Sequence, residues 1–123
     1  MDAARASAFI DDLTGVLTRD AFLHIARYRS RVESLALVEI SADRESLGPR
    51  LIEAADALVR AFPAPSVVGR WDRQRLCVLA AEAALHCAAA QLANGILQFS
   101  VSSLDEILEG KLPWRVRTAM LAD

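Results

Sequence analysis

The sequence has few aromatic residues, almost no lysine and no long apolar run. Aromatic side chains make up 6% of the 123 residues, and Lys111 is the only lysine, so arginine supplies nearly all the positive charge. The 14 Lys+Arg against 16 Asp+Glu give a net charge of −2, whereas a general nucleic-acid-binding protein normally carries a clear positive excess. No apolar run approaches the ~20 residues that span a bilayer. The N-terminus contains the charged residues Asp2 and Arg5 and has no apolar region of the kind that a signal peptide needs. We therefore expect a cytoplasmic protein without membrane insertion or nucleic-acid binding.

Residue types that carry metal or nucleophilic chemistry are sparse and scattered. Cys77 and Cys87 lack the spacing of a metal-ligating pair, and in a cytoplasmic chain we expect reduced thiols with a packing role. His24 and His86 fall on separate predicted helices, and Ser41 has no histidine and acid near it in the sequence. We expect no metal, no cofactor and no nucleophilic serine.

The chain length and the apolar pattern predict one domain of alternating helices and strands. No repeat or linker divides the chain, which we describe as an N-terminal segment 1–17, a core 18–103 and a C-terminal tail 104–123. Apolar residues recur every three or four positions in helices and run continuously or alternate in strands. The predicted helices are 18–32, 48–62, 82–94 and a short 103–110, and the predicted strands are 34–41, 66–71, 75–80 and 96–102.

The order of these elements specifies a fold class. From the first strand on, the order β-α-β-β-α-β is the split pattern of ferredoxin-like domains. Such a domain is α/β of the α+β kind, with an antiparallel sheet and helices packed on one face. Thr18 or Asp20 is a suitable cap for the first helix, and Asp72-Arg73-Gln74 is the predicted turn of a hairpin.

Two stretches resemble GGDEF domains, the diguanylate cyclases. Residues 11–19 read DDLTGVLTR, which is similar to the D-x-L-T-G-L-x-N-R-x-x-F motif that opens such domains, with Thr18 in place of Asn. Residues 68–79 read VGRWDRQRLCVL and resemble the hairpin A-R-[aromatic]-G-G-D-E-F of the family. The residues that match the opening motif are Asp11, Leu13, Thr14, Gly15, Arg19 and Phe22. The resemblance implies a trimmed GGDEF-like fold with a ferredoxin-like palm.

Departures from the family's pattern bear on activity. In GGDEF domains two GTP-bound protomers condense to cyclic di-GMP, and carboxylates from the first strand and the hairpin hold divalent metal against the triphosphate. Here one strand-end carboxylate is lost, the two hairpin glycines are replaced by charged residues, and the acidic pair is replaced as well. The degenerate positions are Ser41, Asp43, Asp72, Arg73, Gln74, Arg75 and Leu76. The resemblance therefore implies a domain without cyclase chemistry.

Two further stretches of the family pattern have no counterpart. The segment that holds guanine and phosphate contacts is missing, because Asp43 is followed directly by residues 44–49. The R-x-x-D site for the inhibitory product is matched by Pro63 and Ser66. Both losses disfavour nucleotide binding.

The arginines of the hairpin and the apolar tail leave alternatives open. Arg70, Arg73 and Arg75 form either a solvated turn or a docking site for an anion or a partner, since guanidinium groups suit carboxylate and phosphate. Trp71 is more typical of packing than of base stacking. The tail residues around Trp114 either cap the sheet or contact a partner.

These observations predict a protein that is not an enzyme. The leading hypothesis is a catalytically inactive GGDEF-like domain, a protein-interaction or regulatory module in bacterial cyclic di-GMP-type signalling that binds a protein partner or forms a homodimer. The alternative is a non-catalytic module that senses a guanine nucleotide or cyclic dinucleotide. A third reading is a piece cut from a longer signalling protein.

Overall fold

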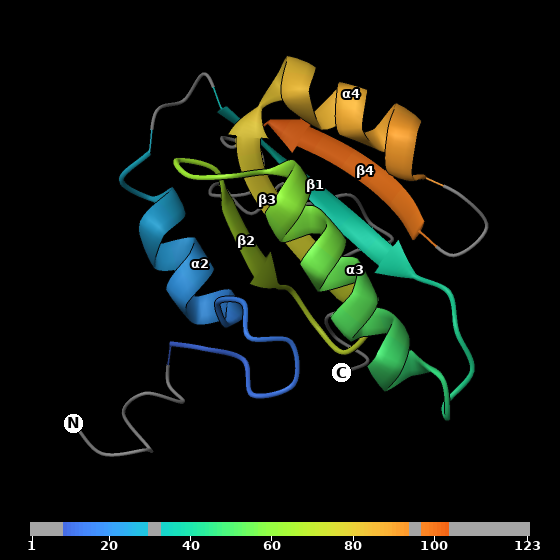
Figure 1. Ribbon diagram of the computed structural model, residues 1–123. Coiled ribbons are helices and arrows are strands. Elements are labelled where there is room, and N and C mark those ends of the chain that lie inside the picture. Colours follow the sequence, from blue (N-terminus) through green and yellow to red (C-terminus); the bar gives the residue numbers. More distant parts are fainter. Residues whose placement is uncertain (1–8, 30–32, 94–96, 104–123) are drawn as a thin grey trace.

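The described part of the chain forms an antiparallel sheet flanked by helices. In the computed structural model, residues 9–29, 33–93 and 97–103 are described, and they contain a four-stranded sheet (Figure 1). The elements are α2 (Arg19–Ala26), β1 (Glu33–Ile40), α3 (Leu47–Ala61), β2 (Val67–Arg70), β3 (Arg75–Ala81), α4 (Glu82–Leu92) and β4 (Leu97–Ser103). The predicted strands are confirmed, and their ends differ from the prediction by at most one residue.

The sheet has the strand order of the predicted fold class. Its order is β2-β3-β1-β4, and every pairing is antiparallel. The nearly continuous apolar run of β1 puts it inside the sheet, between β3 and β4, with residues 34–38 all buried. The α+β class and the ferredoxin-like β-α-β-β-α-β order are therefore confirmed.

Helices cover both faces of the sheet: α3 and α4, the helices of the β-α-β-β-α-β unit, share one face as predicted, and α2, which precedes that unit, lies on the other face. Alternate residues of β1 point to opposite sides, so Ala36, Val38 and Ile40 pack with α3 and α4, whereas Leu35 and Leu37 pack with α2. Figure 1 shows α3 lying across the sheet and α2 beside β2. The short β2 thus lies between two layers of helix.

Close packing of α2 against β2 depends on a glycine. Gly69 lies in β2, and a Cβ at this position would be 2.9 Å from Cδ2 of the fully buried Phe22 and 3.2 Å from Cys77 Sγ. The motif residue Phe22 is therefore a core residue that fills the space above Gly69. Burial also raises the pKa of the Cys77 thiol, which is free and buried as predicted, whereas Cys87 is free but exposed, so its predicted packing role is wrong.

The first predicted helix is shorter than expected. Thr18 caps it, as predicted, by accepting a hydrogen bond from the Ala21 N–H at 3.3 Å, but α2 ends at Ala26 and not at residue 32. Arg29 then forms a two-bond ion pair with Glu33 at the start of β1, both bonds being 2.8 Å long. This ion pair between residues four positions apart connects the chain that follows α2 to the start of β1.

Some predictions fall on parts of the chain that are not described. Ser103, expected to cap a short helix, is the last residue of β4, and the rest of that helix, the tail and Trp114 lie outside the described residues. Within the described ranges, no helix has both the length and the apolar character needed to cross a membrane.

Candidate functional site

The β2–β3 turn, which contains the hairpin residues that resemble the family motif, is held by its own side chains. The backbone N–H of Trp71 donates to the Arg75 carbonyl at 2.8 Å, and this bond closes a turn over residues 72–74, as predicted. Asp72 Oδ1 accepts from the Gln74 N–H at 3.0 Å, a local bond that aspartate forms readily in turns. Because the Asp72 side chain is only 3% exposed, this carboxylate is part of the turn's framework.

Arg75 neutralises two carboxylates at the base of the turn. Its two terminal nitrogens donate to Asp72 Oδ2 and Glu39 Oε2, each at 2.9 Å. Glu39 is the residue directly opposite Arg75 in the β1–β3 pairing, so the strand register brings the two together. The Arg75 side chain is 12% exposed, and its charge is compensated within the domain.

The opening motif forms a tight turn next to this hairpin. Asp11 Oδ2 accepts from the Thr14 N–H at 2.9 Å and from the Thr14 hydroxyl at 2.7 Å. Gly15 follows with φ +77°, a left-handed conformation that favours glycine. Leu17 then bonds to β2, donating to the Val68 carbonyl and accepting from the Arg70 N–H. The motif residues thus serve to add the N-terminal segment to the edge of the sheet.

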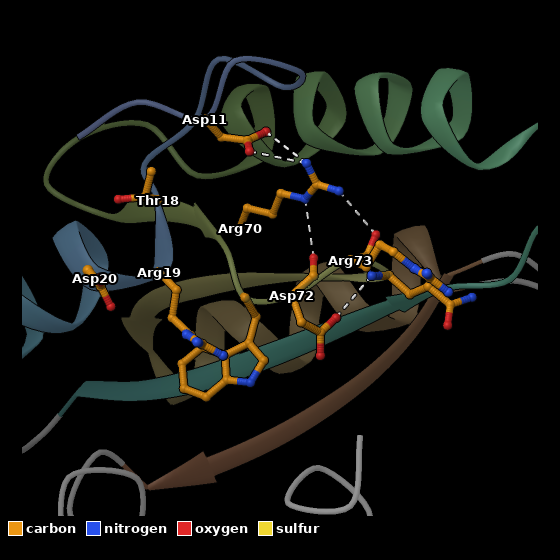
Figure 2. A pocket seen from close by; sticks show the side chains of 9 residues that line it. Asp11, Thr18, Arg19, Asp20, Arg70, Asp72 and Arg73 are labelled. Atoms are coloured by element: carbon orange, nitrogen blue, oxygen red, sulfur yellow. Dashed lines mark hydrogen bonds and ion pairs between the residues drawn. The ribbon is translucent and has the colours of Figure 1, made fainter. Parts of the chain in front are cut away.

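Arg70 connects the opening motif to the hairpin turn. Its Nη1 donates to both carboxylate oxygens of Asp11, at 3.1 and 3.3 Å. Its Nε and Nη2 donate to the carbonyls of Asp72 and Arg73, each at 3.2 Å. Figure 2 shows the guanidinium spanning the space between Asp11 and the turn. We call Asp11, Arg70, Asp72, Arg75 and Glu39 the ion-pair chain.

The environment of Asp11 shifts its titration. Partial burial acts to raise the pKa of this carboxyl, but the hydrogen bonds from Thr14 and the guanidinium of Arg70 outweigh it and hold the pKa below its usual value. Asp11 is therefore an ionised partner of Arg70 at neutral pH.

The strand-end carboxylate also has a structural partner. Asp43 is exposed, and its Oδ1 accepts from the N–H and the hydroxyl of Ser46, both at 2.8 Å. These bonds lower the pKa of Asp43 and fix the turn that leads into α3. Ser41 is exposed. Within residues 9–29, 33–93 and 97–103, no group of three or more His, Cys, Asp or Glu side chains is placed to hold a metal ion.

Two hollows lie on either side of the hairpin turn. The first, the motif-side hollow, has a volume of about 690 Å³ and mixes acids with arginines. The second, the strand-end hollow, has a volume of about 500 Å³ and lies where the end of β1, the start of α3 and the hairpin turn meet. Its lining residues are Leu13, Ala42, Arg44, Leu47, Gly48, Leu51, Arg70, Arg73 and Gln74.

The structure separates the predicted contact residues into two groups. Arg70 and Arg75 are occupied within the ion-pair chain, whereas Arg73 is exposed and its side chain has no hydrogen bond or ion pair to another described residue. Leu76 is fully buried in the sheet, and Trp71 is 2% exposed, which confirms its predicted packing role.

Sequence reasoning missed Glu39 and Arg44. Glu39 is the one charged residue inside the otherwise apolar run of β1, and a hairpin arginine opposite it in register was a signal for the pair. Arg44, which follows Asp43, gave no pattern of its own and lines the strand-end hollow only because α3 begins beside it.

Comparison with known proteins identifies the fold. No protein-family model and no curated protein matches the sequence. Among solved structures, the GGDEF domain of FimX from Pseudomonas aeruginosa superposes with a TM-score of 0.64 at 15% identity, over 81% of this chain and 86% of that one. The GGDEF domain of DgcB from Caulobacter crescentus, solved in complex with c-di-GMP, gives 0.61 at 14% identity, over 89% and 85%.

A further solved structure contains a protein partner. Diguanylate cyclase SiaD from Pseudomonas aeruginosa, in complex with its activator SiaC, gives a TM-score of 0.58 at 18% identity, over 80% of this chain and 50% of that one. Identities at this level establish shared architecture. Together with the sheet order and the two matched motifs, they show that this chain has a GGDEF-like fold.

Proposed function

We propose that this chain is a catalytically inactive GGDEF-like domain that acts as a protein-interaction or regulatory module in cyclic di-GMP-type signalling. The observation that carries the proposal is the ion-pair chain at the altered hairpin. Arg75 stands at an acidic signature position and binds the carboxylates of Asp72 and Glu39 at 2.9 Å each. The acids nearest the turn are thereby neutralised by the domain's own arginine.

The physical argument concerns charge. Transfer of a phosphoryl group from a triphosphate needs a cation to offset the negative charge of the phosphates, and that cation needs accessible carboxylate oxygens. Asp72 is 3% exposed and engaged, and Asp43 is turned toward Ser46. A guanidinium at position 75 would also repel a divalent ion. These features support a domain that keeps the fold and does not carry out the cyclase reaction.

A protein partner is the second element of the proposal. The structure of SiaD with its activator SiaC is a case in which a cyclase with this fold binds another protein. A domain that does not turn over GTP can still signal through surface contacts, either with a partner protein or with a second copy of the chain. We place the domain in the cytoplasm, where such signalling takes place.

One observation favours the alternative function of nucleotide sensing. Arg44 and Arg73 both line the strand-end hollow and are both exposed, so they could meet a phosphate. Calorimetry with GTP, GDP and cyclic di-GMP tests this alternative, and an absence of heat at high micromolar ligand would count against it.

The test of the main proposal is incubation of the purified chain with GTP and Mg²⁺ or Mn²⁺. We expect no cyclic di-GMP by chromatography, while an active GGDEF domain assayed in parallel produces it. Steady turnover would contradict the proposal. The Asp43→Asn variant is the control for such a result, because turnover by this chain should fall with that variant whereas turnover by a contaminant should not.

A further inference from the structure

The strand-end hollow has an uneven charge. Among the described residues, three arginines line it and no acidic residue does. One of them, Arg70, is already compensated by Asp11 at 3.1 Å. The side chains of Arg44 and Arg73 are exposed and form no hydrogen bond or ion pair with any residue of the described ranges. Two guanidinium groups from separate elements therefore face one hollow without a counter-charge from the part of the domain that the structure describes.

Apart from Gln74, the rest of the described lining is apolar. Leu13 is 41% exposed although it belongs to the opening motif, and Leu47 and Leu51 contribute the start of α3. Gly48 adds open space, because a Cβ at its position would meet nothing within 4 Å. A volume of about 500 Å³ is within the usual range of ligand pockets.

We propose that the strand-end hollow docks a short segment of a partner protein that carries carboxylates next to aliphatic side chains. The carboxylates pair with Arg44 and Arg73, and the aliphatic groups cover Leu13 and Leu47. This inference rests on the proposed interaction function and specifies the chemistry of its partner. Arginine is well suited to the role, since its planar fork binds a carboxylate with two parallel bonds.

The lining favours a peptide over a nucleotide. No aromatic side chain is among the described lining residues, so this part of the lining offers a base no stacking surface. Gln74 offers a side-chain amide that could pair with a peptide backbone, since no described residue bonds to it. Exposed leucine beside arginines that have no partner in the described ranges is the pattern expected of an apolar interface core with a polar rim.

The experiment uses the ¹⁵N-labelled full chain and two defined peptides. Acetyl-GLELEG-amide carries the proposed chemistry, and acetyl-GLQLQG-amide is its uncharged match. We expect the acidic peptide to shift the backbone amide signals of Arg44, Gly48, Arg73 and Gln74 in NMR spectra, and the amide peptide to leave them unchanged. In the Arg44→Gln/Arg73→Gln double variant the Kd should rise at least tenfold. Arg60→Gln, an exposed arginine on the last turn of α3, is the matched control and should bind as the wild type does.

Each outcome decides the inference. Absence of shifts at millimolar peptide, equal shifts with both peptides, or equal Kd in the double variant would overturn it. So would GTP or cyclic di-GMP shifting the same signals at lower concentration, because the hollow would then be a nucleotide site. A chain that binds no peptide but also makes no cyclic di-GMP would refute this inference while leaving the proposed inactivity standing, whereas turnover of GTP would refute the latter.

Discussion

The two sides of the β2–β3 hairpin turn use the same residue type in opposite ways. On the covered side, Arg70 and Arg75 have little exposed surface, and each guanidinium binds a carboxylate and further groups of the chain. On the exposed side, Arg44 and Arg73 have no such bonds to described residues. Arginines that lie close to one turn thus divide into structural and available groups.

This difference shows what decides the role of an arginine near the hairpin turn. A guanidinium that is nearly buried must be paired, because an uncompensated charge in a poorly solvated place is costly. An exposed one has its charge in water and is free to exchange water for a partner's carboxylate. The two groups of arginines therefore differ in burial and in the position of the nearest acid. The overall charge composition of the chain does not distinguish them.

The largest expected effect comes from breaking the covered side at Asp72. Asp72→Ala removes one of the two carboxylates of Arg75 and the acceptor of the Gln74 N–H. Loss of one partner of a buried ion pair costs ~3–5 kcal/mol, and we expect the lower end, because Arg75 keeps Glu39. Urea denaturation measures the free energy of unfolding. The control Asp56→Ala removes an exposed carboxylate of α3 and should change that free energy by less than about 0.5 kcal/mol. Equal losses in both variants would show that Asp72 is not structural.

An intermediate effect should separate Arg70 from Arg73. Arg70→Gln leaves Asp11 and two turn carbonyls without their donors, and hydrogen bonds to charged groups are worth about 1.5–3 kcal/mol. Arg73→Gln removes the same charge three positions further along the chain and should stay within about 0.5 kcal/mol of the wild type. Thermal or urea unfolding of both variants makes the comparison. If Arg73→Gln were as destabilising as Arg70→Gln, the division between the two sides would be wrong.

Much of the fold was predictable because its signals are local. The apolar run of β1, the turn residues 72–74 and the capping Thr18 each specify a structure within a few residues of themselves, and the structure confirms them. The opening motif was predictable for the same reason, since Asp11, Thr14 and Gly15 form one turn.

The rest depends on contacts between residues that are distant in the sequence. Arg70 and Asp11 are 59 positions apart, and Arg75 and Glu39 are 36 apart. No local pattern indicates which of several arginines finds which of several acids. The face on which α2 packs has the same origin, because Phe22 packs over Gly69 in β2. Once the strand register is known, it identifies Glu39 as the partner of Arg75, because the two residues lie opposite each other.

The smallest expected effect is a pH dependence that belongs to Asp11. Its pKa is lower in the folded domain than in the unfolded chain, where aspartate titrates near ~3.9. Such a group adds stability at pH values above the unfolded-state pKa, and this contribution is lost as the pH falls through the folded-state pKa. The wild type should therefore exceed Asp11→Asn in free energy of unfolding at neutral pH, and the gap should shrink below about pH 4. Urea titrations from neutral to acidic pH measure the gap. In an Arg70→Gln background, the difference in free energy of unfolding between the forms with and without Asp11→Asn should be smaller and should depend less on pH. The reason is that Thr14 remains as a donor to Asp11 while the guanidinium is gone. A gap that stays constant down to acidic pH would mean that Asp11 is not held ionised by Arg70, and the covered side of the hairpin would then resemble the exposed one.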